Sequence, residues 1–206
     1  EQDTFIEPEL ISSEIGCTNT NSVVLTPLGI FFKSNKGIYL LSASLQLSYV
    51  GAAVEDFNSL AITSAVVVAD KNQVRFTTSD GKCLVFNYIQ QKWTTFSNHK
   101  ALSAVLVDNT YYYLRPDNKL YKESKDFNDN GTNIKLKLES GWMSFAGVQG
   151  FQRVYKMLLL GGFKSNHKLK IKVCYDYIDA VTEEVIIDTK DFINSSTYGS
   201  ESPYGS

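Results

Sequence analysis

The chain has 206 residues, enough for one large or two small domains, and its 43% hydrophobic content excludes wholesale disorder. Its formal net charge of -2 at pH 7 excludes a general electrostatic attraction to nucleic acid or to an anionic membrane. Its apolar runs are far shorter than the roughly 20 residues of a membrane helix, so we expect no membrane segment.

Residues 1–15 are acidic and irregular, and we expect them to form a lead-in segment. The chain begins with Glu1 instead of Met, which indicates a processed chain or a fragment. The Cys residues at positions 17, 83 and 174 are far apart and odd in number, so we expect reduced thiols instead of a disulfide framework.

A repeat follows the lead-in segment. Each copy starts with Ser, continues with an apolar run and an aromatic residue, and reaches a turn residue five positions later. The copies start at Ser22, Ser64 and Ser103. A period of about 40 residues built from short strands is typical of β-propeller blades.

Turn residues divide each copy into short apolar runs that we interpret as strands. In the first copy, strands are expected at 23–25, 30–32, 38–41 and 45–49. In the second copy, they are expected at 62–68, 74–78, 84–88 and 93–96. In the third copy, they are expected at 102–107, 111–114, 120–121 and, after a polar loop, 134–138. The pattern predicts about three four-stranded blades over residues 16–145.

The pattern changes after residue 146. Residues 169–177 alternate between apolar or aromatic side chains and mostly polar ones, which predicts a long strand with one buried face. Residues 185–187 form a further expected strand, and we interpret 146–193 as a β-sandwich-like module. Residues 194–206 are rich in Ser, Gly and Tyr and are expected to form a flexible tail. The predicted fold class is therefore all-β: a partial β-propeller followed by a β-sandwich-like module.

The sequence offers no convincing catalytic or metal-ligating set. His99 and His167 lack other ligands at zinc spacing. Residues 126–131 match the first half of a calcium-loop pattern, but Lys137 stands where a bidentate Glu is needed. We interpret this segment as a polar turn, with a weak calcium site as the alternative. We predict no catalytic residue, no cofactor and no metal, and a protein that is not an enzyme.

One charged cluster is a candidate contact for a partner or for nucleic acid. It consists of Lys164, Lys168, Lys170 and Lys172, the last three of which fall on one face of the expected strand. A basic stripe of this kind can meet phosphates or an acidic partner. The alternative is a solvated edge strand that Lys residues protect against aggregation.

Several short phrases occur in a fixed order over residues 16–177. They are Gly16–Asn19, Ser22–Val24, Thr26–Gly29, Phe31–Phe32, Gly37–Leu41, Gln73–Thr77, Trp93–Phe96, Gly147–Val154 and Tyr175–Tyr177. As a set they resemble a family of bacteriophage short-tail structural proteins. These are propeller-bearing components of the tail nozzle or hub, including tail-tubular and DNA-stabilisation proteins. Members of that family are usually much longer, so the resemblance implies an excised piece.

The resemblance implies a virion protein that is made in the host bacterial cytoplasm and acts through assembly and formation of a channel for DNA ejection. It implies a homo-oligomeric ring, other tail proteins (adaptor, portal and fibres) as partners, and transient contact with passing DNA. It implies no catalytic residue. Large aromatic residues are expected to lock blade to blade, namely Phe32, Phe76, Trp93, Tyr113 and Trp142. The alternative is a glycan- or receptor-binding β-propeller module that uses exposed Tyr and Trp.

Overall fold

The computed structural model describes residues 10–125, 128–144, 154–159, 167–180 and 183–189. The chain divides into two compact units, Glu1–Asn133 and Ile134–Ser206, which are described separately. The sequence had placed the corresponding boundary after residue 145. Antiparallel strands are the main regular secondary structure among the described residues of both units, so the predicted all-β class is confirmed. Among the described residues, no helix is long and apolar enough to cross a membrane.

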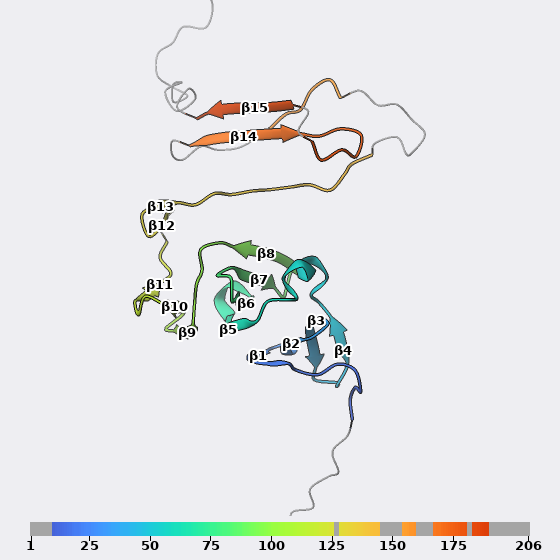
Figure 1. Cartoon of the computed structure of the whole chain (residues 1–206), viewed down its shortest axis with the longest axis vertical. Helices are drawn as coiled ribbons and strands as arrows, with labels where there is room; N and C mark the ends of the chain where they lie inside the picture. The colour runs from blue at the N-terminus through green and yellow to red at the C-terminus, as the bar shows by residue number, and fades with distance from the viewer. Residues whose placement is uncertain (1–9, 126–127, 145–153, 160–166, 181–182, 190–206) are drawn as a thin grey trace, which may run out of the picture. The chain divides into compact units, whose positions relative to one another are not determined.

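The first unit contains three antiparallel meanders in which each strand pairs with the next along the chain (Figure 1). The first sheet has the strands β1 (Asn19–Thr26), β2 (Gly29–Ser34), β3 (Gly37–Ser42) and β4 (Leu47–Tyr49). The second has β5 (Ile62–Val68), β6 (Gln73–Thr78), β7 (Cys83–Asn87) and β8 (Lys92–Phe96). The third has β9 (Ser103–Val107), β10 (Thr110–Leu114) and β11 (Leu120–Lys122).

Tight turns produce these meanders, and their residues have the left-handed backbone that such turns require. Gly29 has a φ of +137°, and a Cβ there would lie 2.1 Å from the carbonyl oxygen of Leu41 on the neighbouring strand. Asn72, Asp108, Asn109 and Asn118 also have positive φ. Asn and Asp tolerate this conformation better than other residues with a side chain, so local sequence determines where each strand ends.

The three sheets of the first unit stack on one another through apolar side chains, and their first strands lie nearest to each other. Between the first and second sheets, the Phe31 and Phe86 rings have centroids 5.6 Å apart. Between the second and third sheets, Val68 packs in a separate cluster with Tyr111 and Tyr113. The segment from the first sheet to the second contains a short 3-10 turn at Ala52–Phe57, and a second 3-10 turn at Ala69–Lys71 connects β5 to β6.

A buried cation holds the connection between the first and second sheets. Lys33 on β2 is only 6% exposed, and its ammonium donates to the carbonyl oxygen of Asn58 at 2.7 Å and to that of Leu60. Burial lowers the pKa of Lys33 below its usual value. Backbone carbonyl groups, instead of a carboxylate, therefore satisfy this ammonium group.

The predicted fourth strand of the third sheet is wrong. Residues 134–138 are not in a strand, and Ile134, Leu136 and Leu138 are 62%, 93% and 94% exposed. Instead, a small hairpin of β12 (Asn128–Asp129) and β13 (Thr132–Asn133) follows β11. Alternation of apolar and polar residues favours a strand only where a neighbouring edge and an apolar layer are available, and no strand within the described residues pairs with this exposed segment.

The second unit contains, within its described residues, one antiparallel hairpin of β14 (Lys168–Val173) and β15 (Glu183–Asp188). Trp142 is 44% exposed, and its ring lies 5.2 Å from that of Tyr177, centroid to centroid. Trp142, predicted to join the blades, therefore lies in the second unit and contacts Tyr177 there. The predicted tail at 194–206 lies outside the described residues, as does much of the predicted sandwich-like module.

Candidate functional site

The basic cluster predicted from the sequence lies mainly on β14. Lys168, Lys170 and Lys172 are exposed and alternate with the half-buried residues Leu169, Ile171 and Val173. The three Lys side chains therefore share one face of the hairpin, as the alternation predicts. Lys164, the fourth predicted member, lies outside the described residues.

Acidic residues of β15 partly neutralise this basic face. Glu184 is the cross-strand neighbour of Lys172, and its carboxylate lies 2.7 Å from the Lys170 ammonium and 3.8 Å from that of Lys172. The hydrogen bond from Lys170 lowers the pKa of Glu184. Lys168 is paired in register with Asp188. A phosphate bound here would have to compete with Glu184 for the same ammonium groups.

A second candidate site is an apolar groove of about 460 Å³ in the first unit. The lining comes from the first and second sheets and from the segment that follows β4. It includes Leu40, Tyr49, Val50, Phe86, Gln91 and Trp93.

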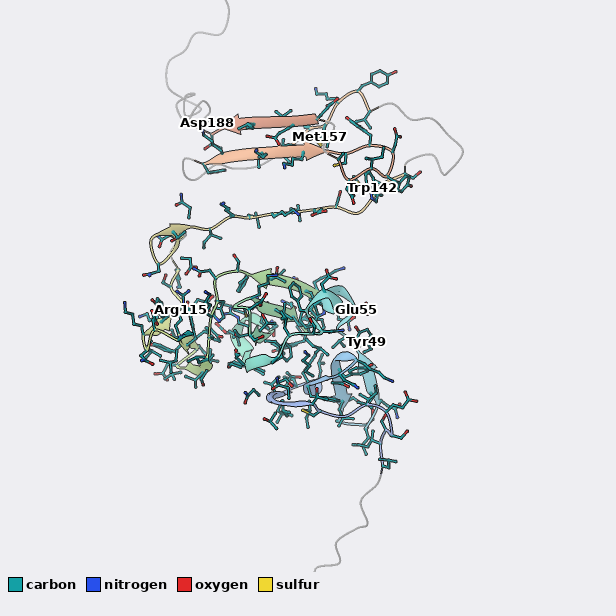
Figure 2. All side chains as sticks on the ribbon, in the orientation of Figure 1. Tyr49, Glu55, Arg115, Trp142, Met157 and Asp188 are labelled. Atoms are coloured by element: carbon teal, nitrogen blue, oxygen red, sulfur yellow. The ribbon has the colours of Figure 1, made fainter. Side chains whose placement is uncertain are left out.

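Aromatic groups give this groove its shape. The Trp93 indole packs on Phe86 with ring centroids 4.8 Å apart, and its Nε1 donates to the carbonyl oxygen of Val50 at 2.7 Å. Tyr49 is 39% exposed, and its hydroxyl donates to Glu55 at 2.7 Å (Figure 2). The groove thus offers aromatic surface with a few polar groups at its edge, an arrangement suited to a small amphipathic ligand.

A partly buried ion pair joins the second and third sheets. The Arg75 guanidinium, on a side chain only 3% exposed, lies 3.0 Å and 3.3 Å from the two carboxylate oxygens of Glu123. It also lies 4.8 Å from the centre of the Tyr111 ring. Burial raises the pKa of Glu123, but hydrogen bonds from Arg75 and Lys71 outweigh burial and leave that pKa below its usual value. Arg75 also donates to the side-chain oxygen of Gln73, and Glu123 also accepts from Lys71 at 2.8 Å, so protein groups occupy both charges and form a structural junction.

His99 is buried against the third sheet. Its Nε2 lies 3.0 Å from the hydroxyl of Tyr111, and its ring centroid lies 4.2 Å from that of Tyr113. Burial, with Arg75 and Arg115 nearby, lowers the pKa of His99 to about 4. His99 is therefore neutral at pH 7 and packs as an aromatic side chain of the core.

In the segment that matches the first half of a calcium loop, residues 126–131, the carboxylate of Asp129 contacts other protein groups. Asp129 accepts a hydrogen bond from the side chain of Asn98 at 2.7 Å and lies 4.0 Å from the Arg115 guanidinium. Asp126, the first residue of the motif, lies outside the described residues. In the part of the chain that the structure describes, no three His, Cys, Asp or Glu side chains gather as a metal site would require.

The thiols do not pair with one another, and Cys83 is fully buried. Burial raises the pKa of Cys83 to about 12, so its thiol stays protonated at neutral pH.

Sequence reasoning missed the groove and the Arg75–Glu123 junction. Arg75 and Glu123 are 48 residues apart in sequence, and the groove brings together residues from Leu28 to Trp93, so no local pattern connects them. The register that opposes Lys172 to Glu184 could have been suggested by aligning the two strands about their connecting segment. Comparison with known proteins adds no identity: no family model, curated protein or solved structure matches this chain.

Proposed function

We propose that the chain is a structural component of a bacteriophage virion tail, part of a nozzle or hub, whose three stacked sheets are blades of a β-propeller. The observation that carries the proposal is the repeat of Ser22, Ser64 and Ser103 at the starts of three successive meanders whose first strands are neighbours. Blades of a propeller are arranged in this way around a common axis. The set of short phrases that resembles tail proteins supports the virion context.

The interior of the first unit suits a scaffold. Its sheets are joined by aromatic packing, by the Trp93 hydrogen bond to Val50 and by the Arg75–Glu123 ion pair. Such contacts fix the relative placement of the sheets, which is the property an assembly component needs. In this proposal the chain acts through shape and assembly, with other tail proteins as partners and DNA as a passing contact.

The test is to purify tailed particles from a bacterial culture that carries the gene. Peptides of this chain should be found in the particles by mass spectrometry, and antibodies raised against it should label the tail end in electron micrographs. Particles that lack the chain, or label elsewhere than on the tail, would contradict the proposal.

The groove favours a second candidate function, a glycan- or receptor-binding module. Its support is that the exposed Tyr49 and the half-buried Trp93 both line the groove. A glycan array probed with the purified chain tests this candidate, with Tyr49→Ala as the variant. A signal that Tyr49→Ala abolishes would favour binding, whereas an array without signal would eliminate the glycan version.

A further inference from the structure

The first and third sheets of the first unit each leave one face uncovered. The equivalent face of the neighbouring sheet is covered in the same unit. We call the face that a sheet turns towards the sheet after it in sequence the forward face, and the opposite one the backward face. The forward face of the first strand carries the repeat Ser and every second residue after it. The backward face carries the residues between them.

The forward faces differ in exposure only at the end of the stack. Ser22 and Ser64, at the starts of the first two copies, are buried, whereas Ser103 is exposed. Four residues later, Val68 is 1% exposed and its equivalent Val107 is 49% exposed. The covering layer explains the difference: Val66 and Val68 lie against Tyr111, Ala104 and Leu106 of the third sheet. No sheet within the described part of the first unit covers the forward face of the third sheet.

The backward faces show the reverse pattern. Val23 and Leu25 on the first sheet are 48% and 72% exposed. Their equivalents on the second sheet, Ala65 and Val67, are partly buried against the core shared with the first sheet. Their equivalents on the third sheet, Ala104 and Leu106, are likewise partly buried, against Val68.

The two uncovered faces are therefore of complementary kinds, one forward and one backward. Within the unit, a forward face packs on a backward face twice: where the first sheet contacts the second and where the second contacts the third. The uncovered forward face also continues as an apolar surface, because Leu114 and Leu120 are cross-strand neighbours and 36% and 68% exposed. On the backward face, Leu25 is likewise opposite Ile30, which is 37% exposed.

From this complementarity we infer that a second copy of the chain covers these faces head to tail, with the third sheet of one copy stacked on the first sheet of the other. An interface between two different patches of identical chains is heterologous, and it closes when the rotation per copy allows. Two copies with three sheets each supply six sheets, within the range of about four to eight blades found in propellers. The inference rests on the assembly role proposed above and names the surfaces that carry it.

The experiment uses the full chain and the variants Leu25→Asp and Val105→Asp, one on each uncovered face. Sedimentation velocity should show the wild type associating to about 46 kDa, twice the 23.1 kDa of one chain. Each variant alone should lose this association at least about tenfold, because a buried Asp carboxylate would face an apolar surface. An equimolar mixture should form a heterodimer, because each variant keeps the face that the other has lost.

Matched controls separate the interface from folding. Ile89→Asp, at a residue 68% exposed and outside both faces, should associate like the wild type. All three variants should keep the circular dichroism spectrum of the wild type, since the substituted side chains are exposed in the single chain.

A wild type that stays monomeric at its highest soluble concentration would overturn the inference and indicate that a different polypeptide covers these faces. Variants that associate like the wild type, or a mixture that stays monomeric, would overturn it as well. None of these outcomes changes the particle test, so failure of the interface and failure of the virion proposal are distinguishable.

Discussion

At the scale of single residues, His99 makes the stability of the first unit dependent on pH. Its folded pKa of about 4 lies below the ordinary 6.5, so the unfolded chain binds a proton more readily than the folded one. The contribution of His99 to the free energy of unfolding should therefore be constant above pH 6.5. It should fall by up to about 3 kcal/mol as the pH drops towards 4. Urea unfolding at pH 7.5, 6 and 5 measures this decrease.

Other carboxyl groups also titrate at low pH, so a variant is needed to isolate the contribution of His99. His99→Gln keeps a polar group near the Tyr111 hydroxyl but does not titrate. The difference in unfolding free energy between wild type and variant should shrink as the pH falls from 7.5 to 5. A difference that stays constant over this range would show that His99 is solvated in the folded chain.

Arg75 is the second residue whose removal should have a measurable cost. Arg75→Met should lower the free energy of unfolding by roughly 2–4 kcal/mol, because Glu123 would keep its charge in a half-buried site without its main partner. The double variant Arg75→Met with Glu123→Gln should recover part of the loss, since no unpaired charge remains. Equal losses in the single and double variants, measured by urea unfolding, would show that the unpaired Glu123 carboxylate carries no penalty, which would contradict this prediction.

At the scale of elements, local sequence was sufficient where turns define the strands. The predicted strand at 62–68 coincides with β5, and that at 93–96 differs from β8 by one residue. The flanking Asn72 and Gln91 adopt the positive φ that ends a strand, and this preference is local. The prediction of a strand at 134–138 was wrong, because no strand within the described residues pairs with this alternating apolar and polar sequence. The Arg75–Glu123 junction could not be predicted, because only the stacking of sheets brings its two charges together.

The β14–β15 hairpin provides a prediction at the same scale. Replacing Lys168, Lys170 and Lys172 together by Gln should lower the free energy of unfolding by less than about 1 kcal/mol, because exposed ion pairs contribute only weakly. The thermal midpoint should therefore change little. Ile171→Gln is the matched control, since it places an amide on the opposite, half-buried face of the same strand. A larger loss in the triple Lys variant than in Ile171→Gln would mean that the Lys face is the packed one.

At the scale of the whole molecule, the division into two units predicts where proteolysis begins. The segment that follows Asn133 has no strand partner, and its side chains at positions 134, 136 and 138 are exposed, so a protease can bind it without unfolding a sheet. Among the cleavage sites within the described residues, brief trypsin treatment should therefore cut first after Lys135 or Lys137, while the Lys and Arg residues within paired strands of the first unit resist. Mass spectrometry of the early fragments identifies the site.

A first cut within β1–β8 would show that the sheets open before the segment between the units is cut. It would also show that their stacking is weaker than the packing of Phe31, Phe76 and Phe86 implies. A surviving fragment that ends near residue 135 would instead show that the stacked sheets are stable without the second unit, as expected because the described residues of their two cores all belong to the first unit.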